Sequence, residues 1–401
     1  MTKGNALIGQ SGGPTSVINS SLAGVIDTAL ASSFIDEIYG MHFGIEGLMK
    51  EWLFDLGRQS SKVLEGLRHT PSSALGSSRH KVQDDDLPVI LGVLKKYNIR
   101  YLFMIGGNDT MDTIHRVEEY CRLNNYEIAG LGIPKTVDND LYGTDHTPGF
   151  PSAARSNILN VLQAGVLARD MQKVDKFVIY QTIGRDAGWL AAATAMAKKN
   201  EDDAPHLIYA PEFYFDDDKF LKEVDKCIKD YGWISIVCGE GLKYADGTSV
   251  SAATKKDKFN NIEFGAMGGA SVGFSLHKKI SDAFGYRGEF QITESLIMSD
   301  YVRASAVDFE EAYRCGVEAM RLAEKGESGN MVTINRVSND PYSVEYGKTP
   351  LKDVAVSAKP MPKEYFNSEG NYVSPEFIEY MKPLVCDLPE FVRLEKIFAK
   401  K

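Results

Sequence analysis

The chain has 401 residues, of which 43% are hydrophobic and 25% charged, and its formal net charge is −10. This composition is typical of a globular protein large enough for two domains, and the acidic balance argues against nucleic acid or anionic membranes as general partners. The sequence contains no apolar run long enough to span a bilayer and no signal-peptide core after Met1, so we expect a cytoplasmic protein. Five scattered cysteines without a CxxC motif agree with reduced thiols.

Short apolar runs alternate with helical patterns along the chain. Strands are predicted at residues 6–9, 101–105, 177–180 and 234–238, each followed by a glycine-containing turn. Helices are predicted at residues 17–30, 111–123 and 189–198. This order is typical of parallel sheets with helices on both faces, in which ligands bind at the carboxyl ends of the strands. After residue 339 the prolines indicate loops, followed by one closing helix near residues 375–384.

The first turn places Gly12 and Gly13 between a strand and a helix. Backbone N–H groups at such a position can bind an anion, because glycines let it approach closely. The turn matches neither a GxGxxG motif nor a Walker loop, so an ordinary strand–helix turn is the alternative.

The second turn, from Gly106 to Thr110, again has two glycines followed by polar side chains. The oxygens of Asn108 and Asp109 suit Mg²⁺, and Thr110 suits phosphate. The same residues are also good helix N-caps, which gives a purely structural alternative.

The third loop brings together Lys135, Thr136, Asp138 and Asp140 after an apolar stretch. A carboxylate near a sugar hydroxyl can act as a general base, and a neighbouring ammonium can hold it ionised and bind phosphate. A fourth turn adds Arg185, whose guanidinium suits a phosphoryl group.

Taken together, these turns resemble the phosphofructokinase family, and in particular its pyrophosphate-dependent branch. The resemblance covers residues 6 to about 336, and its most specific part is the loop Pro-Lys-Thr-Val-Asp-Asn-Asp at 134–140. It implies two similar Rossmann-like three-layer α/β/α domains with mostly parallel sheets and a site between them. We expect a donor and Mg²⁺ domain at residues 1–148, an acceptor domain at 149–300, and a segment at 301–401 that packs back on both.

The resemblance also implies a role for each matching residue. Asp138 is the expected base, and Lys135 and Arg185 are the expected catalytic cations. Residues expected at the phosphoryl donor are Gly13, Arg79, Gly107, Asn108, Asp109 and Thr110, with Asn108 and Asp109 as metal ligands. Residues expected at the acceptor are Thr136, Asp138, Lys176, Ile183, Gly184, Arg185 and Glu240, with Lys176 contributed across a subunit interface.

Two positions indicate the identity of the donor. ATP-using relatives have glycine where this chain has Asp109 and Lys135. A carboxylate at Asp109 would repel the α-phosphate of a nucleotide, whereas the Lys135 ammonium can neutralise a departing phosphate. Both residues favour inorganic pyrophosphate.

The chain departs from the family pattern in two places. Asn108 replaces an acidic metal ligand, and ungapped counting puts Glu289 and Met298 where the family has arginines that bind the sugar 6-phosphate. The loss of two such bonds costs very roughly 3–6 kcal/mol. A shifted loop in which Arg287 or Arg303 compensates is the alternative.

We therefore expect a homodimer or homotetramer that catalyses Mg²⁺-dependent phosphoryl transfer from pyrophosphate to the 1-hydroxyl of fructose 6-phosphate, a glycolytic reaction. One alternative is a pyrophosphate-dependent kinase of a sugar or polyol without the 6-phosphate. Another is a non-catalytic regulatory subunit of the same fold, although the presence of Lys135, Asp138 and Arg185 argues against it.

Overall fold

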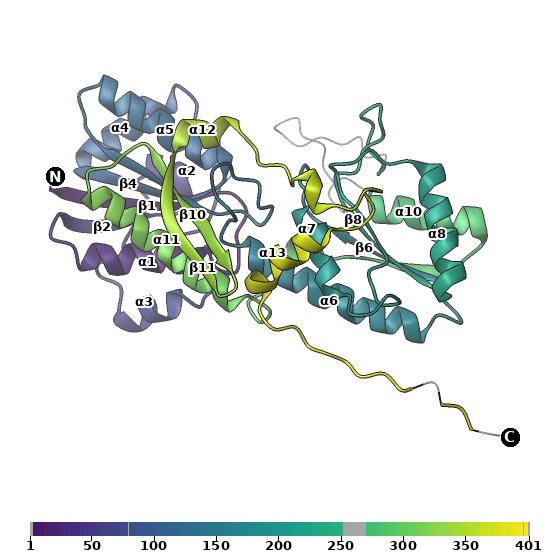
Figure 1. Cartoon of the computed structure of the whole chain (residues 1–401). Helices are drawn as coiled ribbons and strands as arrows, with labels where there is room; N and C mark the ends of the chain where they lie inside the picture. The colour runs from purple at the N-terminus through teal and green to yellow at the C-terminus, as the bar shows by residue number, and fades with distance from the viewer. Residues whose placement is uncertain (1–2, 79, 252–269, 396, 400–401) are drawn as a thin grey trace.

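The computed structural model of the chain describes residues 3–78, 80–251, 270–395 and 397–399 (Figure 1). Its strands form one sheet of seven strands and one of four, with helices packed on both faces of each. The α/β fold class predicted from the sequence is therefore confirmed. None of the helices within the described ranges is long and apolar enough to cross a membrane.

The first sheet has the strand order β11-β10-β5-β4-β1-β2-β3. Its strands are β1 (Gly4–Gln10), β2 (Ile35–Met41), β3 (Leu53–Asp55), β4 (Ile99–Gly106), β5 (Ala129–Pro134), β10 (Asn330–Asn339) and β11 (Tyr342–Pro350). The inner strands pair in parallel, and the edge strands β3 and β11 pair antiparallel to their neighbours. Two strands from the C-terminal quarter of the chain thus extend a sheet that the N-terminal part begins.

Alternation of side chains explains why helices cover both faces of this sheet. In β1, Ala6 and Ile8 join one apolar core and Leu7 joins the other, because successive residues of a strand point to opposite faces. One face carries α1 (Ile18–Leu30), α3 (Ser61–Leu67) and α11 (Ala306–Glu324). The other carries α2 (Gly44–Met49), α4 (Asp86–Lys96), α5 (Asn108–Leu123) and α12 (Leu351–Val356).

The second sheet has the order β7-β8-β6-β9 and is parallel throughout. Its strands are β6 (Phe177–Thr182), β7 (Leu207–Tyr209), β8 (Ile234–Gly239) and β9 (Gly288–Ile292). The helices α6 (Phe150–Asp170), α7 (Trp189–Ala193) and α13 (Pro375–Val385) pack on one face, and α8 (Asp217–Tyr231) and α10 (Val272–Phe284) pack on the other. Figure 1 shows α13 between the two sheets, where it contacts α6 and α11.

Two elements differ from the sequence-based expectation. The chain after residue 339, predicted as loops, first forms the edge strand β11, which pairs with β10 over nine residues and ends at Pro350. The helix predicted at 189–198 ends at Ala193 and continues as a 3-10 turn over Thr194–Ala197. The closing helix is confirmed as α13, whereas the domain limits at 148 and 300 stay a prediction.

Candidate active site

Three of the predicted loops lie side by side at the carboxyl edge of the first sheet. Gln10 at the end of β1 is paired with Ile105 in β4, and Gly106 at the end of β4 is paired with Pro134 at the end of β5. The backbone N–H of Lys135 donates to the carbonyl of Gly106 at 3.1 Å. The loops that follow these strands therefore open at one edge, where ligands of parallel sheets bind.

The first glycine turn is in close contact with two side chains. Gly12 has a φ of +77°, and a Cβ added there would lie 3.0 Å from Lys135 Nζ. A Cβ added to Gly13 would lie 2.5 Å from Met298 Cε, which comes from the 3-10 helix η2 (Glu294–Ser299) after β9. Because glycine has no side chain, the backbone N–H groups of this turn stay accessible, and the Lys135 ammonium lies close enough to contact an anion bound to them.

Desolvation brings the pKa values of Asp138 and Lys135, two residues of the third loop, closer to neutral pH. Loss of solvent, together with the charges of Asp140 and Glu240, raises the pKa of Asp138 to about 7, against the opposing effect of Lys135 and Arg185. Burial lowers the pKa of Lys135 to about 8, although Asp138 and Asp140 oppose this shift. Asp138 is partly exposed to solvent, whereas Lys135 is only 4% exposed. A carboxyl with a pKa near the working pH is well suited to general base catalysis.

The backbone around Asp138 turns sharply and is held by side chains. The N–H of Asp138 donates to Thr136 Oγ1 at 3.1 Å. The next residue, Asn139, has a φ of +55°, in the left-handed region that asparagine tolerates better than most residues. Its Oδ1 accepts from the Thr147 N–H at 3.1 Å, and its Nδ2 donates to the Tyr380 hydroxyl at 3.3 Å. This turn places Asp138 and Asp140 on either side of a fixed asparagine.

The second sheet contributes its own loops to the same place. The Gly184 N–H donates to Glu240 Oε1 at 3.2 Å, and a Cβ added to Gly184 would lie 3.8 Å from Asp138 Oδ1. Gly241 contacts the Arg185 carbonyl so closely that a Cβ there would lie 1.6 Å from that oxygen. Burial raises the pKa of Glu240, while the Gly184 N–H and Arg185 oppose the rise. The loop at residues 135–149, which carries Asp138 and is called the base loop below after the role expected of that residue, thus faces the Gly184–Arg185 loop of the other sheet.

Comparison with known proteins agrees with this arrangement. The Phosphofructokinase family model matches residues 5–323 of the chain. The chain belongs to the phosphofructokinase family. It is 37% identical to a pyrophosphate–fructose 6-phosphate 1-phosphotransferase of Rhodospirillum rubrum, over 98% of this chain and 97% of that protein. It is 32% identical to a sulfofructose kinase of Alkalicoccus urumqiensis, over 91% of this chain and 92% of that protein.

A solved structure shares the fold over almost the whole chain. The pyrophosphate-dependent phosphofructokinase of Marinobacter aquaeolei has a TM-score of 0.87 and 34% identity, covering 98% of this chain and 94% of that chain. The agreement includes both sheets, because they lie within the matched length. The two-sheet fold is therefore the phosphofructokinase fold.

The predicted donor residues of this phosphofructokinase differ in how open they are. Thr110 is buried with its side chain against Gly106, whereas Asp109 points outward on the first turn of α5 with its side chain 89% exposed. Asn108 Nδ2 donates to the carbonyls of Val354 and Ser357 at 2.8 and 3.0 Å. Gly13 and Gly107 lie on the turns themselves, and Arg79 falls outside the described residues.

The site can supply a few oxygen ligands to a metal ion, but no complete protein cage. Asp109 offers an exposed carboxylate, and the hydrogen bonds of Asn108 Nδ2 leave its Oδ1 as the atom able to face a cation. Nowhere in the described ranges do three His, Cys, Asp or Glu side chains gather as a metal site. This set fits Mg²⁺, which proteins commonly hold with one or two side chains plus water and substrate phosphates.

Most predicted acceptor residues lie together, but Lys176 does not. Those at the carboxyl edges of the strands are Thr136, Asp138, Ile183, Gly184, Arg185 and Glu240. Lys176 precedes β6 at the opposite edge, where its Nζ donates to the Gly232 carbonyl at 3.3 Å. Glu289 lies at that same edge, because it pairs with Val178 in the register of β6 and β9. Met298 and Glu289 are therefore at opposite ends of the strands within one chain.

Two residues outside the predicted set hold the base loop and the loop at residues 184–188, which is called the acceptor loop below. Glu212 Oε1 accepts from the N–H groups of Gly188 at 2.8 Å and Met361 at 3.3 Å. Lys359 bonds to the loop that carries Asp138. The sequence held no motif for either residue; a Pro-Glu pair after an apolar strand was the one available signal for Glu212.

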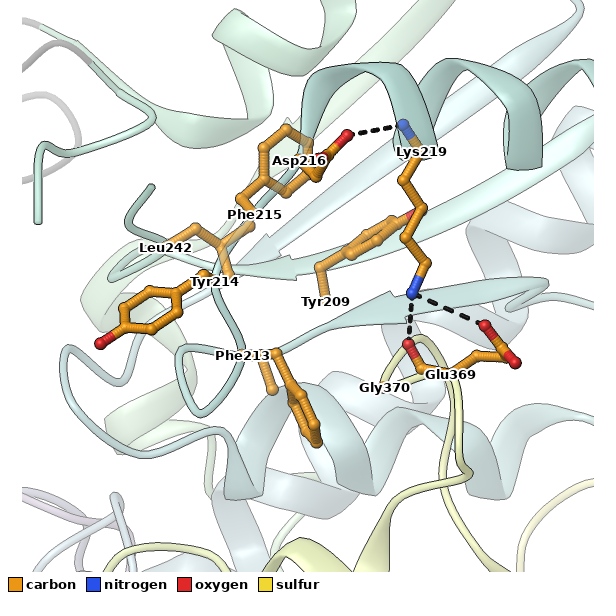
Figure 2. Close-up of a pocket in the computed structure, with 10 residues that line it drawn as sticks. Tyr209, Phe213, Tyr214, Phe215, Asp216, Lys219, Leu242, Glu369 and Gly370 are labelled. Carbon is orange, nitrogen blue, oxygen red and sulfur yellow. Dashed lines mark hydrogen bonds and ion pairs between the residues drawn. The ribbon is translucent and has the colours of Figure 1, made fainter. Parts of the chain in front are cut away.

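A separate cavity of about 280 Å³ lies beside the carboxyl ends of β7 and β8 (Figure 2). Figure 2 shows Tyr209, Phe213 and Lys219 around its centre, with the Lys219 ammonium directed to the carbonyl of Glu369. The remaining lining residues are Ala210, Tyr214, Phe215, Asp216, Leu242, Glu369 and Gly370. None of the predicted site residues lines this cavity, so it is distinct from the facing loops described above.

Proposed function

We propose that this phosphofructokinase transfers a phosphoryl group from inorganic pyrophosphate to the 1-hydroxyl of fructose 6-phosphate, as a cytoplasmic, glycolytic enzyme. The observation that carries the proposal is the position of Asp138 between Lys135 and the Gly184–Arg185 loop. The support is chemical. The carboxyl of Asp138 has a pKa of about 7 and faces the loop that carries Arg185, and two glycine-containing turns beside it can bind an anion. The similarity to a pyrophosphate–fructose 6-phosphate 1-phosphotransferase and to a pyrophosphate-dependent phosphofructokinase supports this donor and acceptor.

The chain's own residues account for the transfer. Asp138 takes the proton from the acceptor hydroxyl as the bond between that oxygen and phosphorus forms and the bridging P–O bond of pyrophosphate breaks. Inorganic phosphate leaves, and the Lys135 ammonium beside Gly12 balances its charge. Arg185 balances charge on the phosphoryl group in transit. Phosphoryl transfer needs positioning and cations more than covalent help, so these groups suffice for the protein's part.

Mg²⁺ would be held by Asp109 and the Oδ1 of Asn108 together with the pyrophosphate oxygens. When bound, the ion supplies positive charge that neutralises the donor phosphates. The exposed carboxylate of Asp109 also supports the choice of pyrophosphate, because it lies on the first turn of α5, where a longer nucleotide donor would continue past the turn.

The acceptor site is proposed to be completed by a second copy of the chain. Lys176 and Glu289 lie at the edge of the second sheet opposite to Arg185, so they cannot contact an acceptor bound at Asp138 of the same chain. In a homodimer or homotetramer in which this edge faces a partner's site, Lys176 and Glu289 would contact the acceptor bound to the partner.

A second candidate acceptor is a fructose derivative with a less charged group at position 6. Two points favour it: counting along the sequence puts Met298 where the family has an arginine for the sugar 6-phosphate, and a sulfofructose kinase is among the relatives. A sulfonate carries one negative charge, whereas a phosphate monoester carries close to two at neutral pH, so fewer cations are needed.

The deciding experiment is an acceptor screen with purified protein, pyrophosphate and Mg²⁺, in which released phosphate is measured. The panel contains fructose 6-phosphate, 6-sulfofructose, fructose and neutral polyols, each repeated with ATP and with the Asp138→Asn variant as a blank. Turnover with fructose 6-phosphate and pyrophosphate supports the first proposal, and preference for the sulfonate supports the second. Absence of turnover across the panel would leave the regulatory-subunit alternative.

A further inference from the structure

Residues 354–361 form a strap that runs from the end of α12 to the second sheet and meets three active-site loops. Its first part accepts the two hydrogen bonds of Asn108 described above. Its middle pairs with the base loop through a bridge between Ala358 and Leu141. The N–H of its last residue, Met361, donates to Glu212 Oε1, which also accepts from the N–H of Gly188 in the acceptor loop. In Figure 1 this yellow-green segment passes from α12 toward the second sheet.

Lys359 is the centre of the strap. Its backbone N–H donates to the carbonyl of Asp140 at 2.7 Å. Its ammonium donates to Asn139 Oδ1 at 3.3 Å and to the carbonyls of Thr144 at 3.0 Å and Asp145 at 2.7 Å. An ammonium has three donors, and here each has an acceptor on the same loop.

The same ammonium also contacts the acceptor side of the site. Nζ lies 5.1 Å from the ring centroid of Trp189, the first residue of α7 and the one that follows the Gly184–Gly188 loop. A cation over an indole face is attracted to it. Lys359 therefore joins the base loop of the first sheet to the first helix after the acceptor loop.

The contact with Asn139 is the one that matters for chemistry. Asn139 has a left-handed backbone and separates Asp138 from Asp140, so its conformation sets where both carboxylates point. Its Oδ1 accepts from Lys359 and from the N–H of Thr147. Without the ammonium, one of the two bonds that hold this oxygen is lost, and the base can rotate away from the acceptor hydroxyl.

We propose that Lys359 is a positioning residue for Asp138, acting through Asn139 without touching either substrate. This inference rests on the proposed function, because it takes Asp138 as the base. It predicts that the loss of Lys359 lowers kcat, which depends on the geometry of the base, more than it changes KM for pyrophosphate.

The test is a double-mutant cycle with Lys359→Met and Asp138→Asn. Methionine keeps most of the apolar stem but removes the charge and its three donors. Alone, Lys359→Met is expected to lower kcat per folded molecule about 10- to 100-fold, with KM for pyrophosphate changed less than about threefold. In the Asp138→Asn background it is expected to have almost no further effect, because the group it positions is already absent.

The matched control is Lys219→Met, which removes a lysine that also donates to a backbone carbonyl of the C-terminal part, that of Glu369. It should leave kcat within about twofold of the unaltered chain. If Lys359→Met does not fold, Lys359→Ala assayed with added propylammonium replaces it, and saturable recovery of kcat is the supporting result.

Two results would overturn the inference. One is an unchanged kcat per folded Lys359→Met molecule; the other is an equal loss in both backgrounds, which would show that Lys359 acts independently of Asp138. Full turnover by Asp138→Asn would instead refute the proposed base, so failure of the proposed function is distinguishable from failure of the inference alone.

Discussion

The two edges of the second sheet differ in whether one chain is enough to use them. At the carboxyl edge, Arg185 and Glu240 meet the base loop of the first sheet. At the amino edge, Lys176 and Glu289 lie across the length of β6, whose six residues span about 20 Å. The carboxyl edge thus brings the proposed catalytic residues together within one chain, whereas Lys176 and Glu289 lie at the far end of the same strands and cannot contact a sugar bound at Asp138 of their own chain. Under the proposal that a partner subunit completes the acceptor site, the chemistry takes place within one chain and acceptor recognition is shared between subunits.

The largest effect is expected from breaking the carboxyl edge. Asp138→Asn should keep the fold but lower kcat by at least ~10²-fold, the usual loss when a general base is removed. Steady-state rates and thermal melts compared with the exposed control Asp246→Asn would measure this. A variant with near-normal turnover would remove Asp138 from the mechanism.

The next effect concerns the donor at the first sheet. Replacing Asp109 and Lys135 together by glycine should lower turnover with pyrophosphate by about 10²-fold and allow ATP to act as donor. The buried Lys135 ammonium is next to Gly12, and its loss removes the charge that balances the leaving phosphate. Rates with each donor, for the double variant and both single variants, test the idea. Preference of the unaltered chain for ATP would contradict it.

The acceptor cations should give an effect of intermediate size. Glu289→Arg replaces an anion by a cation at the amino edge, so it should lower KM for fructose 6-phosphate about 10-fold or more. Met298→Arg places a cation against Gly13 of the donor turn, so it should change KM for pyrophosphate more than KM for fructose 6-phosphate. A matched assay with fructose separates charge recognition from general effects, because fructose carries no anion. Tight, micromolar saturation by fructose 6-phosphate in the unaltered chain would show that other cations already bind the sugar phosphate.

The pH profile distinguishes the acid–base pair within the carboxyl edge. Asp138 must be ionised, so kcat/KM should fall about 10-fold per pH unit below about 7, and Lys135 must be charged, so it should fall again above about 8. The charge of Asp140 raises the pKa of Asp138, so Asp140→Asn should move the acidic limb to lower pH. A limb that stays in place would show that another group controls it.

Sequence alone predicted the fold class and the loops of the carboxyl edge, because apolar runs that end in glycine fix both the strands and the positions after them. It also placed Asp138 next to Lys135, since they share one loop. It missed β11, whose alternating pattern lies among prolines and glycines, and it extended α7 beyond Ala193 because an alanine-rich run favours any helix.

Contacts between distant segments were beyond its reach. Lys359 bonds to Asn139 across 220 residues, and no motif marks the lysine. Met298 was expected only as a missing arginine, whereas its side chain is packed against Gly13. Such contacts depend on how two sheets pack together, and periodicity within one segment carries no information about that packing.

The smallest expected effect comes from mixing two variant subunits, one altered at the amino edge of the second sheet and the other at the catalytic base. Lys176→Ala and Asp138→Asn should each show little turnover at low fructose 6-phosphate, the first from a weakened amino edge and the second from a lost base. When the two variants are unfolded and refolded together, half of randomly formed dimers are mixed. In each mixed dimer, one site combines an intact Asp138 with the partner's intact Lys176. About a quarter of the normal activity should therefore return. No recovery, with mixed dimers demonstrated by differently tagged chains, would mean that the amino edge serves no neighbouring site.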